Sequence, residues 1–211
     1  PSGKSITLDL NGKSITFADD TTNGSGVITN NGSLTIVDSL GGGSVTAEKG
    51  IVIYATADSY TEIRGGTFIS KEVGPSYSRA LSSSGEVLIT GGSFVSEGYS
   101  GNGDNYTNAI AITNLNNDNQ DASLTISPAD GSTVTVTSEN DYAVSSRYGA
   151  DVYIHGGSFA CEGVRSDVYC FEPGGDFIIY EGTFNHEPYP EYIDDGSFVY
   201  FDSGEYSVSP I

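Results

Sequence analysis

The sequence contains no methionine and no tryptophan, only two histidines and two cysteines, and only eight lysine and arginine residues against 28 acidic ones. The formal net charge is −20 at pH 7, and the basic residues are nowhere clustered. Because a run of phosphates is bound by grouped positive charges, this composition argues against nucleic acid and anionic lipid as partners. No apolar run approaches the length that crosses a bilayer, so we expect no membrane insertion.

What is present suffices for a packed core, since 36% of the residues are hydrophobic and 11% are aromatic. Glycine, asparagine and serine are spread evenly along the chain, so no linker divides it and a single domain is expected. The chain starts at Pro1 without methionine or a targeting segment. We therefore expect a monomeric fragment of a larger protein.

One motif recurs along the chain: a large aliphatic residue, a glycine-rich turn and a bulky apolar residue five positions on. The clearest copies are IRGGTF (63–68), ITGGSF (89–94), IHGGSF (154–159) and IYEGTF (179–184). Copies at Ile36 to Val45 and Ile126 to Val134 have a longer turn. The aliphatic residues, called anchors below, lie 25 to 28 residues apart except for one interval of 37; they are Leu10, Ile36, Ile63, Ile89, Ile126, Ile154 and Ile179.

Apolar and polar residues alternate around each anchor, which indicates strands with one buried side. A second short strand precedes the anchor strand in most copies, at 51–54, 80–83, 109–113, 143–146 and 168–171, and a third follows the turn. This pattern predicts an all-β fold, a single-stranded parallel β-helix (solenoid) of about seven rungs. A β-sandwich is the alternative, but it requires two-residue hairpin turns and does not explain one motif recurring in one frame.

The last stretch breaks the repeat. Two short strands, SFVYF and EYSVS, flank a turn at residues 202–204, after two prolines and the Asp194–Asp195 pair. Because an open end of a solenoid is a template for aggregation, this strand pair is expected to be a C-terminal cap. We therefore expect rungs over residues 1–187 and a capping segment over 188–211 of the same domain.

The opening SITLDLNGKSIT, the following GSLTIVDSLGGGSV and the GGTF or GGSF repeats resemble the β-helix regions of large surface proteins from gut Firmicutes and related bacteria. The closing GTFNHEPYPEYIDDGSF is similar to the segment that ends those regions. The resemblance covers almost the whole chain and implies a right-handed, pectin-lyase-like parallel β-helix displayed on a cell surface. The same rung pattern occurs in adhesins, polysaccharide-degrading enzymes and phage fibres, so it does not specify an activity.

Enzymes of this expected fold are polysaccharide lyases or glycosidases, and the sequence lacks the residues that either class requires. No catalytic residue is therefore predicted. A polysaccharide lyase needs an arginine or lysine base, and Arg64, the only basic residue beside an anchor, is better explained by a surface ion pair with Glu62. A glycosidase needs converging carboxylates. Beside His155 these are missing, and Asp194–Asp195 lies in the expected cap.

Two polar loops and the cysteine pair are the candidates for a metal site and a disulfide. The loops at 101–105 and 116–121 offer oxygen atoms that suit Ca²⁺, but neither has the aspartate spacing of a calcium loop, and two histidines are too few for a zinc site. No metal site or cofactor is expected. Cys161 and Cys170 lie on successive predicted strands, and they form either a disulfide in an exported protein or two small core residues.

A ligand-binding patch is predicted on the outward side of the last rungs. Tyr153, His155 and Tyr180 are expected side by side there, with Asp151 and Asp176 next to them. Aromatic faces suit the apolar faces of sugars, and carboxylates accept hydrogen bonds from hydroxyls. The alternative is that loops or the C-terminal segment cover this patch. Thr133, Thr135 and Thr137 alternate only once, so no threonine ladder of the ice-binding kind is expected.

Together these patterns predict a non-enzymatic, extracellular module of a bacterial surface protein, which acts in adhesion or glycan binding or as a rigid stalk. Its anchor to the cell surface would lie in parts of the parent protein outside this chain. Its partners would be a glycan or a surface protein of the host or of another bacterium. A polysaccharide lyase or glycosidase is the first alternative, and a phage fibre or receptor-binding domain is the second.

Overall fold

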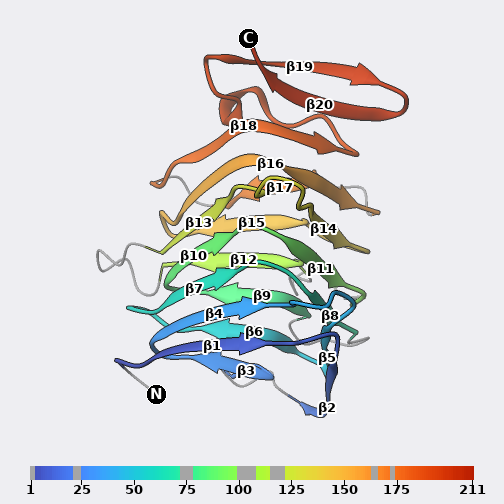
Figure 1. The fold of residues 1–211 in the computed structure, drawn as a ribbon. Helices are drawn as coiled ribbons and strands as arrows, with labels where there is room; N and C mark the ends of the chain where they lie inside the picture. Colours follow the sequence, from blue (N-terminus) through green and yellow to red (C-terminus); the bar gives the residue numbers. More distant parts are fainter. Residues whose placement is uncertain are drawn as a thin grey trace.

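The structure is a computed structural model, and it describes residues 3–20, 25–71, 78–98, 108–114, 122–162, 166–171 and 174–211, without the side chains of residues 19 and 20. These residues form β-strands and one short 3₁₀ helix, η1 (Pro190–Tyr192), with no α-helix among them. Across those ranges no helix has the length and apolar character of a membrane span. The strands stack from the N-terminal to the C-terminal end, as Figure 1 shows. The fold is all-β with long parallel sheets, an arrangement compatible with a parallel β-solenoid.

The first ladder of parallel strands carries the anchor residues. It comprises β1 (Ser5–Asp9), β4 (Ser33–Val37), β7 (Tyr60–Ile63), β10 (Glu86–Ile89), β13 (Ser123–Ile126) and the first parts of β16 (Asp151–Cys161) and β18 (Phe177–Phe184). Six anchors, Ile36 to Ile179, pair with one another in register as predicted. The prediction of Leu10 as the first anchor is wrong: Leu8 pairs with Ile36, and Leu10 is a buried residue at the corner that follows.

The second ladder follows the glycine-rich turns. It comprises β2 (Ser14–Asp20), β5 (Ser44–Lys49), β8 (Thr67–Ser70), β11 (Gly92–Ser96), β14 (Val134–Ser138) and the later parts of β16 and β18. Ile15, Val45, Phe68, Phe94, Phe159 and Phe184 occupy one column, as the repeat predicts. Val136, and not the predicted Val134, holds the remaining place, opposite Phe94 and Phe159.

The third ladder consists of the short strands that precede the anchor strands. They are β3 (Ile28–Asn30), β6 (Ile51–Ala55), β9 (Arg79–Ser83), β12 (Ile110–Thr113), β15 (Val144–Arg147) and β17 (Val168–Cys170). Five of them match the predicted segments to within a residue or two. They form a sheet of their own, so the three ladders together enclose the core.

The core is one continuous stack of aliphatic and aromatic side chains. Ile63, Ile89, Leu81 and Phe94 have no exposed surface. Phe68 and Phe94 stack with ring centroids 5.1 Å apart, and Phe159 and Phe184 repeat that distance near the C-terminal end. Because equivalent positions of successive strands carry side chains of the same kind, each one packs on its neighbours above and below.

The C-terminal segment covers the ends of all three ladders. Ile193 forms a parallel bridge with Ile179 at the end of the first ladder. β20 (Glu205–Pro210) pairs antiparallel with β18 at the end of the second ladder and with the outermost strand, β19 (Ser197–Asp202) (Figure 1). The hydroxyl oxygen of Tyr192 accepts a hydrogen bond from the Cys170 backbone N–H at the end of the third. The predicted strand pair is present, and its antiparallel pairing ends the parallel stack.

Candidate functional site

Unequal turns between the first and second ladders shape the surface of the molecule. The turns at 64–66 and 90–91 are short, whereas those at 38–43 and 127–133 are longer and lie on either side of them. Two hollows result at this corner. The first lies over the short turns and has a volume of about 380 Å³. The second lies between the turn at 127–133 and the strands β16 and β18, with a volume of about 490 Å³.

Glycines form the floor of both hollows, and at two of them a side chain would collide with the adjacent turn. A Cβ atom on Gly92 would lie 2.9 Å from the carbonyl oxygen of Gly66, and the φ of Gly92 is +119°. Gly157 has a φ of +116°, and its Cβ would lie 3.2 Å from the carbonyl oxygen of Val134. Glycine is thus required for the close stacking of turns, and the absence of side chains leaves open space above the backbone.

The wall of the first hollow is fixed by a carboxylate. Asp38 Oδ1 accepts a hydrogen bond of 2.8 Å from the Gly12 backbone N–H, and Oδ2 accepts one of 2.6 Å from Gly43. Arg64 lines the same hollow and forms the predicted ion pair with Glu62, with Nε and Oε1 2.8 Å apart. The turn at 38–43 is therefore held in place at both ends, so the hollow is preformed.

The predicted aromatic patch adjoins the second hollow. His155 lines that hollow, and its ring stacks on the ring of Tyr180 with centroids 4.4 Å apart and planes 5° from parallel. His155 is exposed, whereas Tyr153 and Tyr180 are half-buried. The backbone partner of His155 is Glu181, because the register shifts between β16 and β18 at this point. The C-terminal segment contacts the patch at the Tyr180 carbonyl oxygen, which accepts a hydrogen bond from the Ser197 hydroxyl.

The predicted carboxylates lie beside Tyr153. The Tyr153 hydroxyl donates a hydrogen bond of 3.3 Å to Asp176 Oδ2, and Asp151 Oδ1 accepts one of 2.8 Å from the Asp176 backbone N–H. Partial burial raises the pKa of Tyr153, and the negative charges of Asp151 and Asp176 raise it further. All five predicted residues thus lie together on the outer face of the first ladder.

The outer face of the second ladder carries a row of hydroxyls that the sequence patterns did not predict. Each member directly precedes a residue of the inward column, so its side chain points to the opposite face of the sheet. The members, which we call the hydroxyl ladder, are Ser14, Ser44, Thr67, Ser93, Thr135, Ser158 and Thr183. The row mixes serine with threonine, so it is not the threonine ladder that the sequence argues against.

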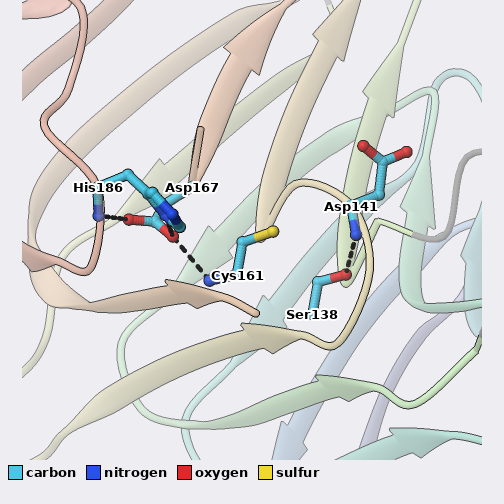
Figure 2. Close-up of polar contacts among 5 residues, drawn as sticks. All are labelled: Ser138, Asp141, Cys161, Asp167 and His186. Atoms are coloured by element: carbon cyan, nitrogen blue, oxygen red, sulfur yellow. Dashed lines mark hydrogen bonds and ion pairs between the residues drawn. The ribbon is translucent and has the colours of Figure 1, made fainter. Parts of the chain in front are cut away.

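A buried polar cluster lies at the opposite corner, between the second and third ladders. The Asp167 side chain is 1% exposed. It accepts hydrogen bonds of 2.7 Å from the Cys161 backbone N–H and 2.6 Å from that of His186, whose Nδ1 lies 3.1 Å from Asp167 Oδ1 (Figure 2). Burial raises the pKa of Asp167 despite these donors.

Cysteine, histidine and aspartate are also the residue types of nucleophilic catalysis, which requires the sulfur beside the imidazole. In Figure 2 the Cys161 sulfur points away from His186. A similar backbone contact lies next to the cluster, where the Asp141 N–H donates to the Ser138 hydroxyl. The arrangement fits a clamp that joins the turn before β17 to the ends of β16 and β18.

The two cysteines lie on the consecutive strands β16 and β17, Cys161 buried and Cys170 half-buried. The structure records both as thiols, and a disulfide between them stays a prediction for the oxidised chain. Within the ranges that the structure describes, no three acidic, histidine or cysteine side chains gather as metal ligands would. The loops that offer oxygen atoms for Ca²⁺, at 101–105 and 116–121, lie outside the described residues.

Comparison with known proteins found no matching family model, no matching curated protein and no matching solved structure. The resemblance to surface proteins of gut bacteria therefore stays a prediction from the sequence motifs. What the chain does has to be inferred from its own surface.

Proposed function

We propose that this chain is a glycan-binding module of a bacterial surface protein, without a catalytic role. The module would be a right-handed parallel β-helix of seven rungs, capped by residues 188–211 and exported to the cell surface as part of a larger protein. Its partner would be a glycan of the host or of another bacterium. The acidic surface, with a net charge of −20, would keep an exported rod soluble.

The stacked pair of His155 and Tyr180 carries this proposal. The pair stands at the border of the second hollow, and an exposed aromatic face beside a hollow suits the apolar face of a sugar ring. Asp151 and Asp176 lie on the same outer face and supply carboxylate oxygens for sugar hydroxyls. A flat aromatic platform with adjacent acceptors is typical of small polar-ligand sites.

Binding to an array of immobilised glycans tests the proposal. We expect the wild-type chain to bind, and the double variant Tyr153→Ala, Tyr180→Ala to lose that binding. Tyr189→Ala is the matched control, because it removes a tyrosine that is 41% exposed on the cap segment. Unchanged binding by the double variant would refute the site.

The same preparation tests the two alternatives. Release of reducing or unsaturated sugar from acidic polysaccharides would show an enzyme of the pectin-lyase-like kind and would refute the non-catalytic role. A stable trimer in solution would favour a phage fibre, because fibre rods associate along their length. A monomer is expected for the surface module.

A further inference from the structure

The hydroxyl ladder runs past both hollows and reaches the cap. Thr67, Ser93 and Thr135 border the first hollow, and Thr135, Ser158 and Thr183 border the second. On the cap, Ser207 pairs with Thr183, and Tyr200 of β19 pairs with Ser207. Paired residues of neighbouring strands share a face, so the row of hydroxyls ends on the phenol of Tyr200.

The end of the row is an aromatic platform. Tyr200 is 43% exposed and Phe198 is 48% exposed, and their ring centroids lie 5.6 Å apart. Both belong to β19, whose alternation turns them to the side opposite Val199, a residue that packs against the core. The face thus combines hydroxyls, two hollows and two exposed aromatic rings in one line.

The charges along this face are negative. Glu97, Glu139 and Glu162 directly follow β11, β14 and β16, at the next outward-facing position of each strand. Their backbone N–H groups continue the ladder hydrogen bonds to Ser70, Ser96 and Ser138. Lys71, at the equivalent position after β8, is paired with Glu48, and Arg64 in the first hollow is paired with Glu62. A polyanion would be repelled along this line, whereas an uncharged ligand with many hydroxyls would meet hydrogen-bond acceptors.

We propose that this face binds an uncharged, extended polysaccharide chain that lies along the stack of strands, from the first hollow to Tyr200. The inference rests on the proposed function and names its ligand class. Successive strands of a ladder lie about 4.8 Å apart, which is close to the length of one sugar unit in an extended chain. Serine and threonine hydroxyls both donate and accept, and so match sugar hydroxyls in either orientation.

Part of the ladder is already oriented. The Ser44 hydroxyl donates to that of Ser14 over 2.9 Å, and the Thr135 hydroxyl donates to that of Ser93 over 2.9 Å. Each such pair leaves one hydroxyl proton and several lone pairs for a ligand. Because the ladder stands on a rigid stack of parallel strands, little ordering is needed when a chain binds along it.

The experiment measures affinity against chain length by calorimetry. The probes are the disaccharide and hexasaccharide of β-1,4-mannan, β-1,4-glucan and β-1,4-xylan, with polygalacturonate as the polyanion. We expect at least one neutral hexasaccharide to bind on the order of tenfold more tightly than its disaccharide, because additional sugar units reach further ladder positions. Polygalacturonate is expected not to bind.

Thr135→Gln places a longer side chain at the border of both hollows, and it should remove the gain from chain length. Thr35→Gln is the matched control on the outer face of the first ladder, where it should leave both affinities within about twofold of wild type. Tyr200→Ala, on the exposed face of the cap, is a second variant that does not depend on the folding of Thr135→Gln. It should weaken hexasaccharide binding alone.

The outcomes separate this inference from the proposed function. Equal affinity for disaccharide and hexasaccharide, lost in Tyr180→Ala but kept in Thr135→Gln, would overturn the ladder site and leave the aromatic patch intact. Absence of binding to every glycan tested, neutral or charged, in every form of the chain would overturn both. Preference for polygalacturonate, or shaping of ice crystals that depends on Thr135, would overturn the ligand class.

Discussion

The imidazole ring of His155 lies parallel to the phenol ring of Tyr180, with ring centroids 4.4 Å apart, although the backbone partner of His155 is Glu181. The irregular register between β16 and β18 therefore does not break the column of side chains. It keeps two flat rings stacked at the edge of the second hollow, where a third ring or a sugar can be added to the stack.

We predict that the stack contributes modestly to stability. Replacing Tyr180 by alanine should lower the free energy of unfolding by about 0.5–1.5 kcal/mol beyond the loss of buried area, whereas Tyr180→Phe should preserve the contact. Urea denaturation followed by circular dichroism measures both. If Tyr180→Phe were as destabilising as Tyr180→Ala, ring stacking would not be the cause.

The core column should tolerate truncation poorly. Phe94 has no exposed surface and stacks on Phe68, so Phe94→Ala should destabilise the fold by about 3–5 kcal/mol through lost packing and a residual cavity. Phe198→Ala, which truncates a phenylalanine that is 48% exposed, should change stability by less than about 1 kcal/mol. Similar losses for the two variants in chemical denaturation would contradict the described burial.

Two glycines of the first hollow should respond differently to alanine. Gly92 combines a φ of +119° with a Cβ position 2.9 Å from a carbonyl oxygen, so Gly92→Ala should cost more than about 1 kcal/mol. At Gly65 the Cβ would meet its nearest neighbour at 3.7 Å, an ordinary contact. Gly65→Ala should therefore be near neutral, and thermal denaturation of the two variants in parallel provides the check.

The buried carboxyl group of Asp167 should make stability depend on pH. Its folded-state pKa is raised by burial, so its contribution favours the folded state most at low pH and declines as pH rises through the ordinary value of 3.8 toward the folded-state pKa. The free energy of unfolding of the chain with Asp167, minus that of its Asp167→Asn variant, should decrease over that range.

The His186→Gln background provides the control for Asp167, because it replaces the adjacent imidazole with an uncharged side chain. Denaturation curves at a series of acidic pH values give the comparison. A difference that grows with rising pH would mean that the hydrogen-bond donors outweigh burial.

The two cysteines are expected to respond to oxidation. In an exported protein we expect Cys161 and Cys170 to form a disulfide, which removes two hydrogen masses from the intact chain and slows its unfolding. Intact mass before and after reduction measures this directly. If the oxidised chain carries two thiols, native-state alkylation should modify half-buried Cys170 before buried Cys161.

Most of the fold follows from the sequence because one motif recurs at nearly constant spacing. The anchors from Ile36 to Ile179 and the C-terminal strand pair lie where alternation and glycine turns predict them. The two register errors have one cause. Leu8 and Leu10 are apolar residues two positions apart, as are Val134 and Val136. Residues two apart on a strand face the same side, so alternation alone cannot tell which of the two pairs with the next strand.

The candidate site was predictable only in part. His155 and Tyr180 each follow an anchor directly, so their stacking could be read from the repeat. The hydroxyl ladder has no fixed spacing in the sequence, because turns of unequal length separate its members from the anchors, and serine and threonine alternate within it. The clamp at Asp167 joins the ends of three strands of two sheets, and no local pattern marks it.

The unequal turns divide the molecule into two parts with separate requirements. The interior constrains only the residues that face inward, whereas the turns at 38–43 and 127–133 bound the hollows. Adding or removing residues in one of these turns would change the size of a hollow without altering a core side chain. Related chains could therefore accommodate different ligands through changes in these turns alone.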